Sequence, residues 1–365
     1  MGLRSVRSSG KVILLGEHGV VHGRPALAAG LSTGCHAETV SAAATGLVIE
    51  ADDDAPYFAA PYSTASESAS VKDGASSDGA SVKDGASSDG ASEKSGANGD
   101  PRVEVWADSP PYPDELRETL RRAFCAVLEG YQQQRPGLEI RISRGLPPGA
   151  GLGCSAALGV AVVRALDSSL GIERHAEQVA EESWRWERVF HGNPSGIDSA
   201  IAASGGIALF RRGEPLRLVE SSVEPLLVIG HSGRSASTRA MVEKVARLHA
   251  ERPGAVEKIF DEIAELVLCG SAALEAGDAM GLAELMDRDQ VLLRELGVST
   301  PRLDEMCQAA LRAGAAGAKL TGSGGGGCMI ALVENGRVAE NVLEALRGLG
   351  YAAFSASLSP RSSTR

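Results

Sequence analysis

The glycine-rich run between Pro147 and Ser155 constrains the fold more than any other part of this sequence. It reads Pro-Pro-Gly-Ala-Gly-Leu-Gly-Cys-Ser, with an alternating apolar segment at 138–142 before it and an alanine-rich segment at 156–170 after it. These patterns predict a strand, a glycine-rich loop and a helix. Glycines let backbone N–H groups approach a ligand closely, and a helix N-terminus adds unpaired donors. The run therefore predicts a phosphate site.

Other interpretations of this run are less specific. No Gly-Lys-Ser/Thr follows, so it is not a Walker A loop, and its context does not favour a dinucleotide fingerprint. A glycine-rich turn that binds nothing is the plain alternative. The paired prolines, the alternating glycines and the final serine favour the phosphate site. Its candidate residues are Pro148, Gly149, Ala150, Gly151, Leu152, Gly153, Cys154 and Ser155.

A second polar motif follows an apolar strand near the N-terminus. Lys11 stands at the head of the predicted strand 11–15, where a buried cation is costly unless it pairs with a negative group. Glu17 and His18 come at the end of this strand, and loops commonly carry function. The alternative is a lysine that reaches the surface beside an ordinary polar turn.

A third motif places two carboxylates on either side of a tight turn. Glu187 lies near the end of a predicted helix, Asn-Pro-Ser-Gly predicts a turn, and Asp198 begins another helical stretch. One carboxylate could hold a divalent ion while the other accepts a proton. Asp198 could instead be a helix N-cap, and His191 a structural histidine. A second glycine-rich loop, 322–327, could close over phosphates or the substrate, or be a flexible hinge.

The rest of the chain indicates two α+β domains, which we place at 1–215 and 216–365. Strands and helices are mixed without a regular βαβ repeat. The segment 63–100 differs from both domains, because it is nearly all Ser, Ala, Gly, Asp and Lys and contains an exact tandem copy of eleven residues, at 70–80 and 81–91. Such a composition cannot offset its ordering entropy, so we expect a disordered insertion in a surface loop.

Charge and composition exclude several classes of protein. A net charge of -11 argues against a nucleic-acid partner. The six cysteines form no CxxC pair, which favours reduced thiols over a metal site or a disulfide framework. No run of about 18 apolar residues exists, so we expect no membrane span. The expected location is the cytoplasm.

Taken together, the motifs resemble those of the GHMP kinase family. The family patterns PGKxxLxGEH, PxGxGLGSSAA and KxTGAGGGG have counterparts here in SGKVILLGEH, PPGAGLGCSAA and KLTGSGGGG, in the same order. Ser9, Cys154 and Ser323 depart from the family residues but leave the charged groups intact. The intervening HGNPSGID looks like the mevalonate kinases within this family. The resemblance covers most of the chain outside the insertion.

The resemblance implies a fold and a chemistry. The fold would combine an N-terminal ribosomal-protein-S5-like domain with a ferredoxin-like α+β domain. The activity would be ATP-dependent phosphorylation of mevalonate with Mg²⁺, and a homodimer would be compatible with it. Two alternatives stay open: a kinase for another small alcohol, such as phosphomevalonate or a sugar, and a ligand-binding relative without catalysis. Arg234 and Arg239 keep a phosphorylated acceptor in consideration.

The resemblance also implies roles for single residues. The loop from Gly149 to Ser155 would bind the ATP phosphates, with Lys11 beside them. The metal would be held by Ser155 and Glu187, and Asp198 would be the base, paired with Lys11. The residues implied near the substrate are Glu17, His18, Asp198, Thr238 and Gly322.

Overall fold

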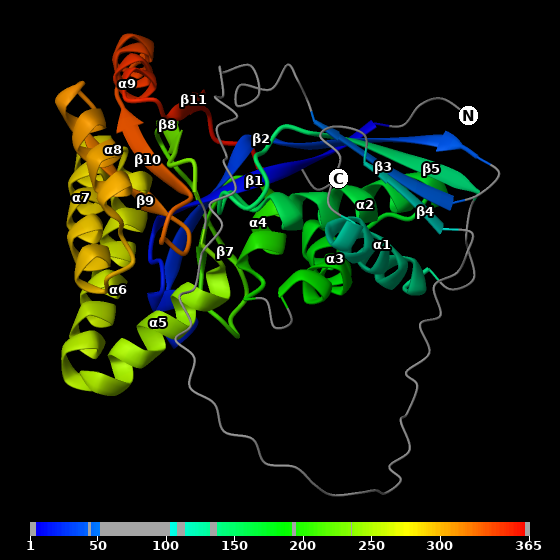
Figure 1. The fold of residues 1–365 in the computed structure, drawn as a ribbon, viewed down its shortest axis with the longest axis horizontal. Coiled ribbons are helices and arrows are strands. Elements are labelled where there is room, and N and C mark those ends of the chain that lie inside the picture. Colours follow the sequence, from blue (N-terminus) through cyan, green and yellow to red (C-terminus); the bar gives the residue numbers. More distant parts are fainter. Residues whose placement is uncertain are drawn as a thin grey trace, which may run out of the picture.

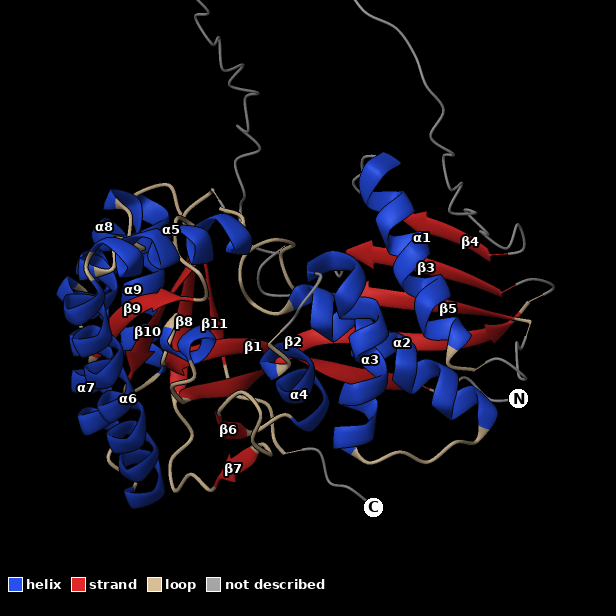
Figure 2. Ribbon diagram, turned by 90° about the horizontal axis from the view of Figure 1, so that it is seen from below, coloured by secondary structure: helices blue, strands red, loops and turns tan. Residues whose placement is uncertain are grey.

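The computed structural model describes residues 5–42, 45–51, 103–107, 114–131, 137–191, 195–234 and 236–361. The insertion at 63–100 lies outside these residues. The described chain forms two sheets with helices packed on them (Figures 1 and 2). It is a mixed α+β fold, as the sequence predicts.

The first sheet has seven strands in the order β4-β3-β5-β2-β6-β7, with β1 paired to β2. The strands are β1 (Ser5–Leu15), β2 (Ala26–Ser41), β3 (Thr45–Ala51), β4 (Val103–Ala107), β5 (Leu138–Arg144), β6 (Ile207–Phe210) and β7 (Arg217–Val219). Four helices lie on one face of this sheet (Figure 2): α1 (Asp114–Glu129), α2 (Cys154–Leu170), α3 (Ala176–His191) and α4 (Ile197–Ser204). A short 3-10 helix, η1 (Gly19–His22), follows β1.

The second sheet has four antiparallel strands in the order β11-β8-β10-β9. Its strands are β8 (Leu226–His231), β9 (Gly317–Thr321), β10 (Cys328–Val333) and β11 (Ala352–Ala356). Its helices are α5 (Thr238–Glu251), α6 (Pro253–Ala276), α7 (Ala279–Glu295), α8 (Pro301–Arg312) and α9 (Gly336–Gly348). With the helices counted in groups, the chain order is β-α-β-β-α-β, which is the ferredoxin-like arrangement.

Local sequence explains where several of these helices begin. Asp278, Thr300 and Asn335 are the N-caps of α7, α8 and α9, and each side chain accepts a hydrogen bond from a backbone N–H in the first turn. Pro301 adds a preset φ at the first position of α8. These caps fix the helices that support the second glycine-rich loop.

Five elements were not predicted from the sequence: η1, β3, β7, α5 and β9. The predicted helices and the other strands are present, but not all with the predicted ends. The strands predicted at 11–15 and 26–31 begin at Ser5 and continue to Ser41, and the helix predicted near 256–268 covers Pro253–Ala276. β9 escaped prediction because its central residue is Lys319, a charged side chain that is nevertheless fully buried. The interpretation of Asp198 as an N-cap is wrong, because Gly196 caps α4 and Asp198 lies in its first turn.

The two sheets are joined closely. The first sheet ends at Val219 and the second begins at Leu226, while the division into domains at 215 and 216 stays a prediction. Thr321 of β9 ties the second sheet to β1, because its hydroxyl accepts from the N–H of Ile13 at 2.9 Å and donates to the Ile13 carbonyl at 3.1 Å. The second glycine-rich loop is thereby held against the end of β1.

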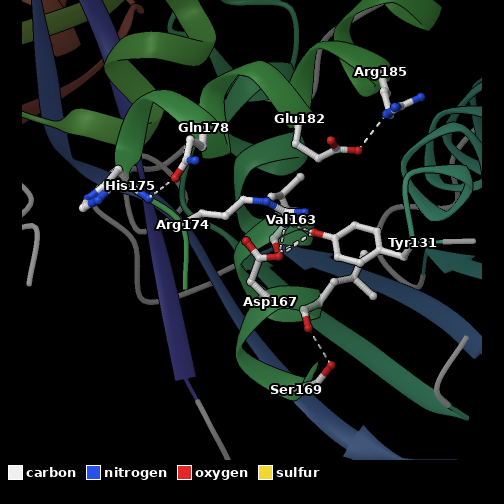
Figure 3. Close-up of polar contacts among 10 residues, drawn as sticks. Tyr131, Val163, Asp167, Ser169, Arg174, His175, Gln178, Glu182 and Arg185 are labelled. Atoms are coloured by element: carbon white, nitrogen blue, oxygen red, sulfur yellow. Dashed lines mark hydrogen bonds and ion pairs between the residues drawn. The ribbon is translucent and has the colours of Figure 1, made fainter. Parts of the chain in front are cut away.

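A polar cluster between α1, α2 and α3 holds the helical layer together. Tyr131 donates a hydrogen bond to Asp167 Oδ1 at 2.7 Å, and Arg174 contacts both residues (Figure 3). The Arg174 guanidinium also lies 5.1 Å from the centre of the Tyr131 ring. These contacts fix α3, the helix that carries Glu187. No helix in the described part of the chain is both long and apolar enough to cross a membrane.

Candidate active site

The first glycine-rich loop joins β5 to α2, with Gly149 and Gly151 exposed and Gly153 half-buried. Gly149, Gly151 and Gly153 have φ angles of 70°, 81° and 72°, which other residues rarely adopt. Gly153 is the N-cap of α2, and it supplies no side chain to its first turn. The first N–H groups of α2 are therefore left uncapped by Gly153, with the positive end of the helix dipole behind them. The loop thus has the geometry expected of the phosphate site predicted from the sequence, and binding of a phosphate there stays a prediction.

Lys11 lies directly beneath this loop. Its backbone N–H donates to the Leu152 carbonyl at 2.9 Å, and a Cβ at Gly153 would lie 3.2 Å from the Lys11 Cβ. The Lys11 ammonium pairs with Asp198 Oδ1 at 3.0 Å. The Lys11 side chain is only 5% exposed, whereas that of Asp198 is 37% exposed. The buried ammonium of Lys11 is thus paired with a carboxylate, and the Asp198 carboxylate remains accessible to a ligand.

Ser155 and Glu187 form a second pair beside the first. The Ser155 hydroxyl donates to Glu187 Oε1 at 2.5 Å. Burial raises the pKa of Glu187 to about 7, and Asp198 raises it too, while the hydrogen bond from Ser155 and the charge of Lys11 lower it. His191 Nε2 lies 3.8 Å from Glu187 Oε2, so the histidine faces the same carboxylate. Glu187 is thus within electrostatic reach of both members of the first pair.

The second glycine-rich loop faces the first one. A Cβ at Gly322 would lie 3.5 Å from the Gly151 Cα, and Gly322 has a φ of 86°. Next to it, the Ser323 carbonyl lies 3.0 Å from His18 Nε2, and the Ser323 hydroxyl donates to Thr238 at 3.4 Å. The structure therefore brings together three residues that the sequence implies near the substrate.

His18 adopts an uncommon backbone conformation, with a φ of 61°. Burial lowers the pKa of His18 to about 4, although its contact with the Ser323 carbonyl opposes this shift. The imidazole is therefore neutral near pH 7 and donates its Nε2–H to that carbonyl. We infer a role in holding the second loop, because a neutral, nearly fully buried imidazole carries no charge toward a ligand.

Glu17 does not lie at an open surface, and its place near the substrate stays a prediction. Its side chain is fully buried, and so are those of its partners Lys319 and Asp289. The Lys319 ammonium pairs with Glu17 Oε1 and lies 3.4 Å from Asp289 Oδ2. Burial raises the pKa of both carboxyl groups, while Lys319 lowers it. This buried ionic cluster joins the end of β1 to β9 and α7.

Lys319 and Asp289 were missed as site-forming residues. Lys319 is the first residue of the KLTGSGGGG motif, but the sequence around it does not indicate that its side chain is buried. Asp289 lies in α7, where most other charged residues are exposed, so its pattern is that of an ordinary amphipathic helix. Both residues support the second loop from below and contact no open surface.

Comparison with known proteins gives this site its context. The model of the GHMP kinase N-terminal domain matches residues 118–206, and that of the GHMP kinase C-terminal domain matches residues 271–352. A mevalonate kinase from Pyrococcus abyssi is 32% identical over 339 residues, which is 88% of this chain and 86% of the relative. This chain belongs to the GHMP kinase family. A mevalonate kinase from Aeropyrum pernix is 31% identical over 97% of this chain and 96% of its own length.

The three-dimensional comparison agrees with the sequence. The crystal structure of L. major mevalonate kinase in complex with R-mevalonate superposes with a TM-score of 0.76 and 25% identity, over 98% of this chain and 96% of that one. As a GHMP kinase, this protein is an ATP-dependent enzyme. The first match includes the glycine-rich loop, Ser155, Glu187 and Asp198, whereas Lys11 lies before it in β1. The second match includes the other glycine-rich loop.

Proposed function

We propose that this GHMP kinase transfers the terminal phosphoryl group of ATP to mevalonate and forms 5-phosphomevalonate. The observation that carries the proposal is the Lys11–Asp198 pair, at 3.0 Å, directly under the glycine-rich loop. Its substrate is inferred from the mevalonate kinases that resemble this chain over most of its length. The HGNPSGID segment supports the same acceptor.

The proposed chemistry follows from the positions of the side chains. Asp198 takes the proton of the acceptor hydroxyl as the hydroxyl oxygen forms a bond to the terminal phosphorus, and the bond from that phosphorus to the ADP oxygen breaks. A positioned base of this kind contributes about 10²–10⁴-fold to the rate. Lys11 orients Asp198 and offsets charge on the transferred group. The N–H groups from Gly149 to Ser155 hold the phosphates, since phosphoryl transfer depends mainly on positioning and charge stabilisation.

The Ser155–Glu187 pair fits a magnesium ion. Magnesium favours oxygen ligands, and it commonly takes one or two from protein while phosphate and water supply the rest. A hydroxyl 2.5 Å from a buried carboxylate provides such a set, and no larger group of metal-binding side chains occurs in the described residues. Bound there, Mg²⁺ would neutralise charge on the phosphate oxygens. Ser155 and Glu187 would hold it, as part of this proposal.

A substrate panel tests the proposal. The purified protein is assayed with ATP and Mg²⁺ against mevalonate, phosphomevalonate, galactose and homoserine, with release of ADP as the readout. We expect turnover with mevalonate and at least about tenfold lower kcat/KM for the others, which corresponds to about 1.4 kcal/mol of discrimination. Turnover with another alcohol and none with mevalonate would overturn the choice of acceptor. A cytoplasmic location and a homodimer remain parts of the proposal, to be tested by fractionation and sedimentation.

A further inference from the structure

The chain returns to the first sheet after β11, which ends beside β2 (Figure 1). Leu358 forms an antiparallel bridge with Leu31 of β2. The N–H of Ser359 then donates to the Gly30 carbonyl at 2.8 Å. We call residues 357–361 the strap. It links the end of the second sheet to the middle of the first.

Three backbone hydrogen bonds close a ring at this point. Ser359 donates to Gly30 at 2.8 Å, Gly30 donates to the Gly206 carbonyl at 2.8 Å, and Gly206 donates to the Ser359 carbonyl at 3.2 Å. Each residue gives one bond and accepts one. The ring therefore fastens three separate segments together: β2, the turn between α4 and β6, and the strap.

Gly30 in the ring and Gly205 beside it have no room for a side chain. A Cβ at Gly30 would lie 2.3 Å from the Ser359 Oγ and 3.0 Å from the Gly205 Cα. A Cβ at Gly205 would lie 2.5 Å from the Pro360 carbonyl oxygen, and Gly205 also has a φ of 60°. The backbones approach more closely than any larger residue permits. Glycine at these positions is thus explained by the strap and not by a ligand.

The ring adjoins the two elements that carry the Lys11–Asp198 pair, β1 and α4. Gly30 is the cross-strand partner of Lys11 in the β1–β2 ladder. Gly205 ends α4, and Asp198 lies in the first turn of the same helix. At a rise of about 1.5 Å per residue, roughly 10 Å of helix separates Gly205 from Asp198. A small tilt at the strap would therefore move the carboxylate relative to the ammonium.

We propose that the strap is a positioning device that fixes α4 so that Asp198 meets Lys11 in reactive geometry. The proposal rests on the proposed function, in which Asp198 is the base. It predicts an effect on the chemical step and not on nucleotide binding, because the hydrogen bonds of the strap in the described residues go to β2 and the α4–β6 turn and not to either glycine-rich loop. A displacement of about 1 Å at a reacting group can cost on the order of 10²-fold in rate.

Loss of the strap should tilt α4 without unfolding it. Arg164 of α2 donates a hydrogen bond to the Ala203 carbonyl at 2.5 Å, which holds the end of α4 independently. Ile197 and Ile201 of α4 are also buried against the sheet. Variants of the strap therefore test geometry in a folded enzyme.

The experiment is a double-mutant cycle between Gly30 and Ser359 in the full chain. Gly30→Ala introduces the 2.3 Å contact, and Ser359→Ala removes the hydroxyl that causes it. Ser359→Ala alone is the matched control, since its hydroxyl has no hydrogen-bond partner among the described residues. The readouts are kcat, KM for ATP, the melting temperature, and hydrogen exchange of the peptide that spans α4.

We expect Gly30→Ala to lower kcat by about 10–10²-fold with little change in KM for ATP, and to speed exchange in α4. Ser359→Ala should keep kcat within about twofold of the parent, because it removes a buried hydroxyl without a hydrogen-bond partner among the described residues and leaves the backbone bonds in place. The double variant should recover at least about threefold in kcat, because residues in contact are coupled. Should Gly30→Ala fail to fold, Ser359→Pro tests the same point by removing the N–H donor to Gly30.

Three results would overturn the proposal that the strap positions α4. They are an unchanged kcat and unchanged exchange in Gly30→Ala, no recovery in the double variant, or a fall in kcat that only matches a fall in folded protein. Hydrogen exchange in α4 is measured without turnover. It therefore tests the role of the strap even if the enzyme phosphorylates an acceptor other than mevalonate. An absence of wild-type turnover with every acceptor would contradict the proposed function alone.

Discussion

Replacing Lys319 with methionine should reveal how much the buried ionic cluster contributes to stability. The change keeps an unbranched side chain of similar length but removes the only ammonium that Glu17 and Asp289 contact in the described structure. All three side chains are fully buried. Breaking a buried ion pair by removing one partner costs about 3–5 kcal/mol, because an uncompensated charge stays behind. We expect a loss of this size for Lys319→Met at pH 8.

The loss should depend on pH, and its sign follows from the raised pKa values. Burial raises the pKa of Glu17 and Asp289, so the folded protein holds protons that the unfolded chain has released above its ordinary carboxyl pKa. Such groups stabilise the folded state at low pH and lose this contribution as pH rises through the folded pKa. Without Lys319 the carboxyl groups can become neutral by protonation. Lys319→Met should therefore cost less free energy at pH 5 than at pH 8.

Urea unfolding measures both effects. Fluorescence of Trp186, which is fully buried, and circular dichroism should report the same transition. Asp289→Asn is the matched control, because it removes one buried negative charge and leaves the Lys319–Glu17 pair in place. This variant should lower the free energy of unfolding by less than about 1 kcal/mol, or raise it. A loss below about 1 kcal/mol for Lys319→Met, or equal losses at pH 5 and pH 8, would refute this reasoning.

Three further predictions concern the site and the insertion. Ser155→Ala should lower kcat/KM for ATP by about 10–100-fold, because a hydrogen bond to a charged group contributes about 1.5–3 kcal/mol. Steady-state kinetics with varied ATP measure this, and an unchanged kcat/KM would contradict it. The pKa of His18 is lowered to about 4 in the folded protein, so the unfolded chain binds an extra proton as pH falls from 6.5 to 4. Over this range the parent should lose up to about 3 kcal/mol of unfolding free energy relative to the His18→Gln variant. A constant difference between the urea midpoints of the two proteins at every pH would contradict this. Removal of residues 63–100 should leave the melting temperature and kcat nearly unchanged, and a large loss of either would show that the segment packs or gates the site.

The sequence predicts the glycine-rich loop well because its signal is local. The glycines with positive φ, the strand before them and the helix after them all lie within one stretch of chain. The cost of a buried lysine also predicts correctly that Lys11 needs an acidic partner. That this partner is Asp198 followed from the family resemblance, because the two residues lie far apart in the sequence.

The cluster around Glu17 could not be predicted in the same way. Its partners Lys319 and Asp289 are about three hundred residues distant in the chain, and nothing local marks them as buried. The strap has the same character, because Gly30, Gly205 and Ser359 meet only in the folded protein. Helix α5, by contrast, was overlooked despite a readable pattern, since Met241 and Val245 are spaced as on one helical face and both are buried.

The most direct test of the account is the kcat of Asp198→Asn with mevalonate, ATP and Mg²⁺, measured beside the parent. The account predicts a fall of at least about 10²-fold, because the amide cannot accept the hydroxyl proton. KM for ATP should stay close to that of the parent, since the glycine-rich loop is intact. Glu340→Gln, at an exposed carboxylate on α9, serves as the control and should keep full activity. An Asp198→Asn enzyme that turns over mevalonate as fast as the parent would contradict the account.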